Sequence, residues 1–305
     1  PTANNAKMVF PNIRPFKCIA HLSNISNSQV NNSSPSYLFY ETTKGFHFRS
    51  FESLCVTKNG EQVKPKQKFR YITVPIDRFG HEVLDEKGNK LDKIMEGFQA
   101  VEQYQFLNNF HDVATNTTLG TYGHTVITHN LYDKSYKKSD FHYHNYYDQT
   151  KHADGPNPAI VDTPVDFDNK SVSDYPESRV TVMATTQFAH NEDTGSYGID
   201  VEQDGITDAS RVSQQMQVAS GTRLKLTIKG QSYLEAGDVI EFEYYAVERK
   251  QKEELRPDPQ YAGRYIISKI RHRVTNDEYV QVLECVKDSV HTKYKSYNGK
   301  TFTGK

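Results

Sequence analysis

Several residue types and patterns are scarce or missing in this chain of 305 residues. It contains no tryptophan, and its three cysteines, Cys18, Cys55 and Cys285, form no CxxC pair. Buried structural thiols are therefore the default interpretation, and no disulfide framework or zinc site is expected from them. No apolar run approaches the ~20 residues of a transmembrane helix, and no segment is laid out like a signal peptide. We expect a protein that is made and folded in a cytoplasm and has no membrane partner.

An excess of charge of either sign is also missing. Lys and Arg total 37 against 38 Asp and Glu, so the net charge is −1. This balance disfavours sequence-specific nucleic-acid binding through the surface as a whole. Hydrophobic residues make up 36% of the chain, below the ~45–50% usual for soluble domains. Twenty Tyr and sixteen Phe suit either interfaces or plain strands, and we expect neighbouring chains to supply part of the core.

What is present most clearly is a series of strands at the C-terminal end. Residues 223–229 alternate charged or polar residues with Leu and Ile, and Gly230 ends the run,. Gly237 and Asp238 then form a turn, because glycine accepts positive φ and Asp can bind the turn's own backbone. We predict that 239–247 is the partner strand of 223–229.

A second hairpin follows a polar loop. Segments 263–274, which begins at Gly263, and 278–288 have strand composition and are separated by Thr-Asn-Asp at 275–277. That spacing is typical of a β-hairpin. The region 222–290 is thus predicted to be an antiparallel β-meander.

These residues carry a resemblance to a known family. The ordered segments are Leu-Lys-Leu-Thr-Ile-Lys-Gly (224–230), Leu-Glu-Ala-Gly-Asp-Val-Ile (234–240), Ala-Gly-Arg-Tyr-Ile-Ile-Ser-Lys-Ile-Arg-His (262–272) and Tyr-Val-Gln-Val-Leu-Glu-Cys-Val-Lys-Asp-Ser (279–289). Together they resemble the last domain of the central baseplate hub proteins of contractile-tailed bacteriophages. Segments 14–23 and 37–54, the latter with a turn at Gly45, are similar to the middle of the same family. Segment 123–136 resembles the family's segment of a strand followed by Tyr-Asp. The pieces cover most of the chain in the family's order.

The resemblance implies a fold, a function and partners. The fold is β-rich α+β, with antiparallel barrel-like hub or tube domains and a few short helices. The function is that of a structural virion protein in the tail baseplate, a homotrimeric ring that joins the tail tube to the central spike and meets the surrounding wedge proteins. The related spike hubs of secretion systems and contractile bacteriocins share this fold. Gly45, Gly230, Gly237, Asp238 and Gly263 are the structural turn residues of the resemblance.

The resemblance also predicts the domain organisation. We expect an α+β hub domain at 1–150, a Pro/Asp-rich loop or linker at 151–178, a barrel-like domain at 179–290 and a basic flexible tail at 291–305. Because the chain starts without Met and matches the family from its middle, we expect an N-terminal barrel to be missing. Elsewhere, hydrophobic periodicity predicts helices from Pro15 to the loop at 23–36, after Ser50, at 92–108 and at 207–220, and strands at 37–41, 46–49, 69–75, 121–130, 140–147 and 179–190.

Signals for catalysis are weak. No GxSxG, HExxH or phosphate-binding glycine loop is present, and the paired acids lie in charged runs. We therefore predict no enzyme, no catalytic residue and no cofactor. The weak metal candidates are His142 and His144, which would share one face of a strand, and His129 on a neighbouring strand.

One alternative function comes from another class. Tyr143, Tyr146 and Tyr147 could form an exposed platform on which sugar rings stack. That pattern is typical of a glycan-binding or glycan-degrading virion or secreted protein, although hydrolysis would also need paired acids at a fixed separation.

Overall fold

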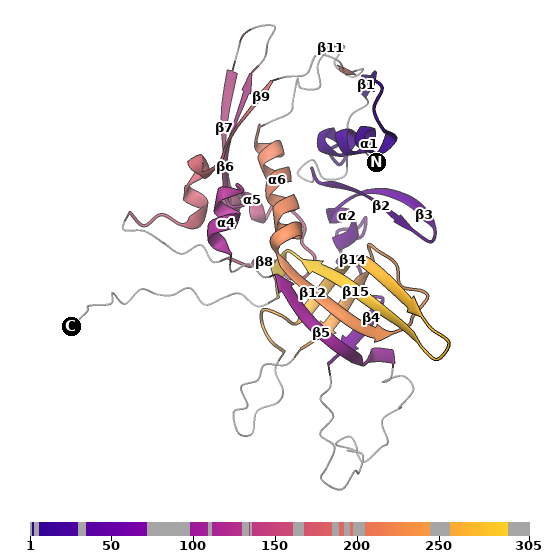
Figure 1. Cartoon of the computed structure of the whole chain (residues 1–305). Coiled ribbons are helices and arrows are strands. Elements are labelled where there is room, and N and C mark those ends of the chain that lie inside the picture. The colour runs from indigo at the N-terminus through magenta and orange to yellow at the C-terminus, as the bar shows by residue number, and fades with distance from the viewer. Residues whose placement is uncertain are drawn as a thin grey trace, which may run out of the picture.

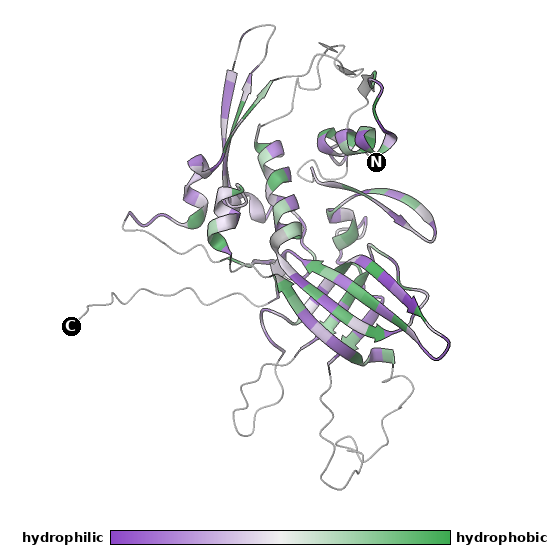
Figure 2. Ribbon diagram, in the orientation of Figure 1, coloured by the Kyte–Doolittle hydropathy of each residue, from purple (hydrophilic) through white to green (hydrophobic). Residues whose placement is uncertain are grey.

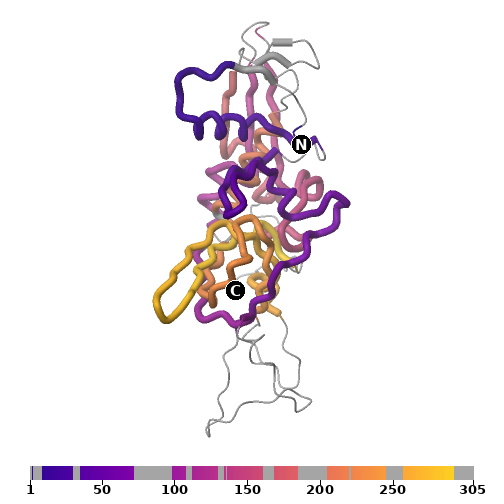
Figure 3. The backbone as a smooth tube through the Cα atoms, turned by 90° about the vertical axis from the view of Figure 1, so that its right-hand side faces the viewer, coloured from indigo at the N-terminus to yellow at the C-terminus, as the bar shows by residue number. Residues whose placement is uncertain are grey.

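The computed structural model shows a strand-rich α+β protein (Figure 1). It describes residues 2, 6–29, 35–71, 98–108, 112–129, 134, 136–160, 168–184, 189–191, 196–197, 205–244 and 257–291. Turned by 90°, the chain forms a narrow stack with the large sheet at one end (Figure 3). The predicted fold class is confirmed. None of the described helices is both long enough and apolar enough to cross a membrane.

A six-stranded sheet forms the base of the molecule. Its strands are β4 (Gln67–Arg70), β5 (Val101–Asn108), β12 (Thr222–Lys229), β13 (Val239–Glu243), β14 (Gly263–Val274) and β15 (Tyr279–Lys287), in the spatial order β4-β13-β14-β15-β12-β5. All pairs are antiparallel except β4 with β13, which is parallel. The predicted hairpin across 275–277 is confirmed as β14–β15.

The predicted pairing of 223–229 with 239–247 is wrong. β12 lies between β15 and β5, whereas β13 lies between β4 and β14. The connection between them is not a tight turn, because Leu234 at its centre is buried in the core of the sheet. At its two ends the amide of Gly230 donates to the Tyr279 carbonyl of β15 at 2.7 Å, and that of Gly237 to the Ile267 carbonyl of β14 at 2.8 Å. The connection therefore reaches across the strands that separate β12 from β13.

The sheet curls until its two end strands almost meet. A single parallel bridge joins Arg70, at the end of β4, to Ala100, just before β5. Apolar and polar residues alternate along the strands (Figure 2), and the inward residues form one buried core. That core contains Phe69, Val101, Leu224, Leu226, Ile228, Leu234, Ile240, Phe242, Tyr265, Ile267, Leu283 and Cys285. The curled sheet is a half-barrel filled by side chains.

The helix predicted over 92–108 is wrong for its second half, because residues 98–99 are helical but the chain is a strand from residue 101 on. Residues 101–108 form strand β5, which pairs with β12; residues 92–97 lie outside the described part. The side chains of Val101, Tyr104 and Phe106 pack inward, with a register shift opposite Thr227 that accommodates the uneven spacing. The same apolar spacing is compatible with a helical stripe, so the distant partner strand decided the outcome.

A three-stranded sheet with helices lies at the other end. Its strands are β6 (Gly123–His129), β7 (Tyr136–His142) and β9 (Val180–Ala184), in the order β7-β6-β9 with β9 parallel to β6. Helix α6 (Gly205–Ser220) packs on β6 and β7 and leads directly into β12. α4 (Val113–Thr118) and α5 (Tyr143–Tyr147) lie beside it. The helix predicted at 207–220 is confirmed, whereas the strand predicted at 140–147 ends at His142 and becomes α5.

A two-stranded hairpin occupies the middle of the stack. β2 (Tyr37–Thr42) pairs with β3 (Gly45–Ser50), as predicted, and is followed by α2 (Glu52–Cys55). α1 (Pro15–Ile25), also predicted, contacts β2. The inner side of the hairpin, with α2, covers Val239, Ile266 and Val286 on the outer face of the large sheet. A second core thus joins hairpin and half-barrel.

The remaining elements are short. They are β1 (Ala6–Met8), β8 (Asn157–Pro158), β10 (Ala189–Asn191), β11 (Ser196–Tyr197), β16 (Ser289–Val290) and the 3-10 helices η1 (Val172–Asp174) and η2 (Pro176–Ser178). β1 pairs with β10 and β10 with β11, while β8 pairs with β16. The strand predicted at 179–190 is thus two strands, β9 and β10, around residues that the structure does not describe.

Strand pairing crosses the predicted domain limits. β4 and β5, from the range 1–150, are the two ends of the sheet built by 222–287, and β9 joins β6 in the other sheet. The domain limits at 150 and 179 therefore stay a prediction. The six-stranded and the three-stranded sheet each contain strands from before residue 150 and from after residue 179. The segment 161–167 and the predicted tail from 292 onward lie outside the described residues.

Candidate functional site

Three of the turn glycines of the resemblance, Gly230, Gly237 and Gly263, lie in close contact with other parts of the chain. Gly45, Gly237 and Gly263 have φ of 112°, 89° and 118°, a region that side chains other than glycine rarely enter. A Cβ on Gly230 would overlap the Tyr279 ring, and one on Gly263 the Asp154 carboxylate. Gly237 and Gly263 therefore need glycine for both space and conformation, Gly45 for conformation and Gly230 for space.

The turn at Gly237 is the docking point of the β2–β3 hairpin. A Cβ there would lie 2.6 Å from the Tyr40 hydroxyl. Asp238 ties the turn through Oδ2, which accepts from the Glu235 amide at 2.8 Å and from Lys66 Nζ at 2.6 Å. Glu235 in turn binds Lys44 Nζ at 2.7 Å. The hairpin is held by partly exposed ion pairs around a close backbone approach, and such pairs contribute modestly to stability.

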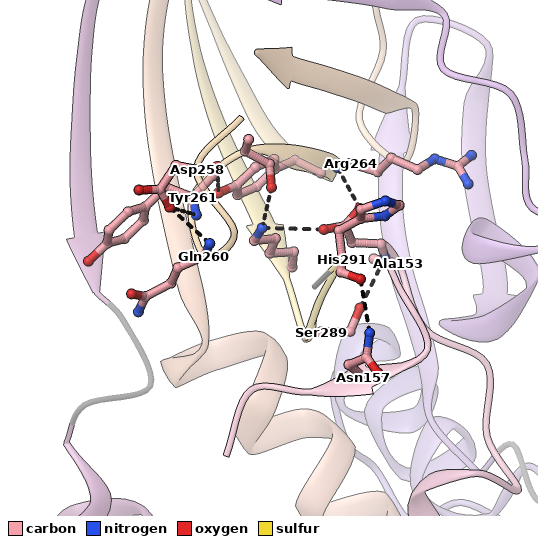
Figure 4. Close-up of polar contacts among 12 residues, drawn as sticks. Ala153, Asn157, Asp258, Gln260, Tyr261, Arg264, Ser289 and His291 are labelled. Carbon is pink, nitrogen blue, oxygen red and sulfur yellow. Dashed lines mark hydrogen bonds and ion pairs between the residues drawn. The ribbon is translucent and has the colours of Figure 1, made fainter. Parts of the chain in front are cut away.

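A buried charge pair, Asp154 with Lys287, lies against Gly263. Figure 4 shows its surroundings, with Ala153, Arg264 and Ser289 labelled. Lys287, at the end of β15, is 0% exposed. Its Nζ donates to the Ala262 carbonyl at 2.8 Å, lies 3.4 Å from Asp154 Oδ2 and sits 4.9 Å from the centre of the Tyr265 ring. Asp154 Oδ1 accepts from the Arg264 amide at 3.0 Å. Burial lowers the pKa of Lys287, and the Asp154 carboxylate opposes that shift.

The next residue along the chain makes a second buried pair. Asp288 Oδ2 lies 2.8 Å from His152 Nδ1, and Asp288 Oδ1 accepts from the Ala153 amide at 3.0 Å. His152 Nε2 lies 3.0 Å from the Tyr147 carbonyl, and its ring stacks on that of Tyr147 at 3.8 Å. Both ring nitrogens therefore face acceptors, which favours the imidazolium form.

The pKa values of this second pair move apart. Burial alone would lower the pKa of His152, but the Asp288 carboxylate and the Tyr147 carbonyl raise it above its ordinary value. Burial would raise the pKa of Asp288, but His152 and the Ala153 amide lower it. The two pairs fasten segment 152–155 to the end of β15. We name this set, Asp154 with Lys287 and His152 with Asp288, the buried joint.

Two buried thiols near the buried joint are poor nucleophiles. Burial raises the pKa of the nearby Cys55 thiol well above its usual value and also raises that of Cys285, and a protonated buried thiol is a poor nucleophile. The charged side chains of the joint are paired with each other and closed off from solvent. Its arrangement suits fixing one part of the chain against another.

The sequence did not reveal the buried joint. Lys287 and Asp154 are 133 residues apart, so no local spacing connects them. The one available signal was a lysine and an aspartate directly after the apolar run of β15, at the point where a buried strand ends.

The predicted histidines do not come together. His142 is the last residue of β7 and pairs with Gly123, whereas His129 is at the opposite end of β6 and pairs with Tyr136. His144 lies in α5, so it does not share a strand face with His142 as predicted. His142 Nδ1 lies 2.9 Å from the Ser173 carbonyl. Within the described residues, no three His, Cys, Asp or Glu side chains form a possible metal site.

The predicted tyrosine platform is also wrong. Tyr143 and Tyr147 are buried beside Tyr122 and Phe141, and Tyr146 packs against the same cluster. Stacking of sugars needs exposed rings, which these residues do not offer. Their strand prediction failed for the same reason, because the chain turns into α5 to bury them under α6.

Two exposed features remain as candidate interaction surfaces. The first is the outer side of β9: Val180 and Val182 are 54% and 68% exposed on the face away from α6. β9 is an end strand of its sheet over Val180–Ala184. An end strand with apolar side chains and unpaired backbone is a ready template for another strand. The alternating sequence Val-Thr-Val-Met was the signal that would have found it.

The second is an aromatic face on the β2–β3 hairpin. The rings of Tyr37 and Phe48 stack at 5.0 Å and those of Phe39 and Phe46 at 5.6 Å, and Phe16 of α1 contacts Phe39 at 5.9 Å. Phe16 and Phe46 are largely exposed. Exposed aromatic clusters are typical of protein contacts.

The fold thus defines a strand-rich α+β protein built on a curled half-barrel. No family model and no curated protein matches the chain. Among solved structures, it is similar to the crystal structure of the tail protein from Neisseria meningitidis MC58, with 9% identity and a TM-score of 0.39. The alignment covers 94% of this chain and 60% of that one, so the chain spans about three fifths of the length of its neighbour.

Proposed function

We propose that this chain is a structural virion protein, the baseplate hub subunit of a contractile phage tail. In this proposal three copies form a ring in the tail baseplate, between the tail tube and the central spike, with wedge proteins around it. A phage-derived contractile machine would use the same ring. The proposed role is structural and involves no chemical reaction.

Two lines support it. The ordered segments of the resemblance cover most of the chain, and those at 224–289 lie in or next to the half-barrel. The exposed end strand β9 is the observation that most directly supports a ring. A ring needs heterologous contacts that repeat and close, and an apolar strand with a free edge provides one half of such a contact. The outward Val180 and Val182 would be buried by the neighbouring copy.

Light scattering across a dilution series tests the proposal. We expect a mass three times the 35.0 kDa of one chain, persisting on dilution. Val180→Lys with Val182→Lys should convert the trimer to monomer without unfolding, because the substituted side chains already point to solvent. Val274→Lys is the matched control: it is 73% exposed at the tip of the β14–β15 hairpin and should leave the trimer intact.

Two outcomes would contradict the proposal. The ring assignment fails if the wild-type chain stays monomeric at all concentrations. The role of β9 fails if the double lysine variant remains a trimer. The wild-type protein tests the trimeric ring and the double lysine variant tests the role of β9, so the two failures can be told apart.

A further inference from the structure

The outer face of the half-barrel is covered at one end and open at the other. At the covered end, Val239, Ile266 and Val286 pack under the hairpin and α2. Further along the same strands, Val280 and Val282 of β15 lie outside that cluster; Val280 is 9% exposed and Val282 is half-buried, and both line a hollow of about 600 Å³. The open half is therefore a separate surface.

Strand register places cations around this hollow. On β12, Lys225 pairs with Gln105 on one side and Glu284 on the other, and Thr227 with Gln103 and Val282. On β14, Lys269, Arg271 and Arg273 lie opposite Glu284, Val282 and Val280. Lys229 lies opposite Val280 at the end of β12. The cations come from two strands that flank β15.

The acidic side chains nearby do not balance these cations. Glu284 is shared by Arg223 at 3.4 Å and Lys269 at 3.5 Å, and Glu278 lies 3.8 Å from Arg273. Glu102 of β5 lines the hollow as a third acidic side chain, against the six cations Arg223, Lys225, Lys229, Lys269, Arg271 and Arg273 on β12 and β14. In the described part of the chain, Lys225, Lys229 and Arg271 form no ion pair. On a chain with a net charge of −1, this is a concentrated positive surface.

The lining of the hollow suits an extended peptide. Polar and charged side chains of β5, β12 and β14 surround it, namely Glu102, Gln103, Gln105, Lys225, Thr227 and Arg273, and Val280 and Val282 of β15 supply apolar surface. Its lining residues come from four neighbouring strands, β14, β15, β12 and β5, so an extended segment that crosses these strands can contact all of them. Tyr71 and Tyr104 line the rim, but their rings pack against each other at 4.5 Å, which disfavours base stacking.

We infer that this hollow binds an acidic, extended segment of another protein. Carboxylates of the segment would pair with Lys225, Lys229 and Arg271, and its apolar atoms would cover Val280 and Val282. The inference does not depend on the ring, because it concerns the half-barrel and not β9. Partly desolvated charge pairs of this kind give specificity and fast association.

The test uses the full chain and a fluorescent oligoglutamate peptide. We expect saturable binding in fluorescence polarisation that weakens as salt is raised, since salt screens the pairs. Arg271→Glu with Arg273→Glu should weaken binding by at least about tenfold. The control, Arg14→Glu with Lys17→Glu, makes the same charge change on exposed residues near α1 and should change binding less than about twofold. Carbodiimide coupling should link the peptide to Lys225 or Lys229, identified by mass spectrometry.

Three results would overturn the inference. They are absence of saturable peptide binding, equal weakening by the two double variants, and coupling that spreads over lysines elsewhere. A single-stranded DNA oligomer of similar charge is the competing probe. If it binds more tightly than the peptide and is lost in the Arg271→Glu/Arg273→Glu variant, the hollow is a nucleic-acid surface instead. Circular dichroism of each variant separates loss of binding from loss of fold.

Discussion

Removing Lys287 should destabilise the protein far more than removing an exposed lysine. In Lys287→Met the Ala262 carbonyl loses its 2.8 Å donor, and the Asp154 carboxylate, 1% exposed, loses its cation. An unsatisfied buried carbonyl costs about 1–3 kcal/mol, and breaking a buried ion pair from one side costs about 3–5 kcal/mol in all. We expect a loss in the free energy of unfolding of about 3–5 kcal/mol.

A second substitution should restore part of that loss. In Lys287→Met with Asp154→Asn the carboxylate charge is gone, while the introduced amide oxygen can still accept from the Arg264 amide. We expect the double variant to recover about 2 kcal/mol relative to Lys287→Met, a coupling within the usual range for residues in contact.

Urea unfolding followed by circular dichroism measures these changes, with the slope m compared between variants. Lys269→Met is the control: Lys269 is exposed and 3.5 Å from Glu284, and its loss should cost less than about 0.5 kcal/mol. A Lys287→Met variant within about 1 kcal/mol of wild type would refute the reasoning. So would a double variant no more stable than the single one.

Four more predictions concern the turn glycines, the second buried pair and the thiols. Gly263→Ala should lower the free energy of unfolding by about 3 kcal/mol or more, because φ is 118° and the added Cβ would meet Asp154,. The control is Gly60→Ala in the same urea assay. Gly60 has a φ of 80° but open space around it, so the loss should be about 1 kcal/mol,. Because the folded pKa of His152 is raised, its contribution to stability is complete below about pH 6.5 and is lost as pH rises through the folded value,. The stability difference between wild type and His152→Gln should therefore shrink from pH 6 to 9, by no more than about 1.4 kcal/mol per pH unit, and a constant difference would contradict this. Because the pKa of Asp288 is lowered in the folded protein, the contribution of Asp288 to stability is present above about pH 4 and is lost as the pH falls below that value,. Finally, a thiol reagent should label Cys18 in the native protein and reach the fully buried Cys55 and Cys285 only on unfolding, which counting labelled thiols by mass spectrometry would check,.

Local patterns predicted the elements that depend on local chemistry. The β14–β15 hairpin, the β2–β3 hairpin, α1 and α6 were all predictable, because turn residues and periodicity lie within each segment. β5 was not, since its apolar spacing fits a helix as well, and the strand it joins follows more than 100 residues later. The turn at Gly237 and Asp238 was read correctly as a turn but wrongly as a link between neighbouring strands.

The candidate sites were harder to predict for the same reason. The buried joint pairs side chains that no sequence spacing relates, and the hollow takes its walls from β5, β12, β14 and β15. The histidines and tyrosines drew attention because they cluster in the sequence between 124 and 147. In the fold, β7 ends at His142 and α5 buries Tyr143 and Tyr147, so closeness in sequence did not become closeness in a site.

The arrangement of the half-barrel also determines when it can be completed during synthesis. β4 and β5 are synthesised early, and they pair with β13 and β12. β13 and β12 are joined in turn by β14 and β15, which are among the last residues described. Until the ribosome has released that C-terminal part, the early strands have no sheet to join, and Tyr104, Phe106 and Phe69 stay exposed. Long-range pairing of this kind slows folding and exposes unpaired strands to aggregation. A chain truncated before β14 would keep β4, β5, β12 and β13 but lose the two central strands that join them, and with those strands the buried joint and the hollow.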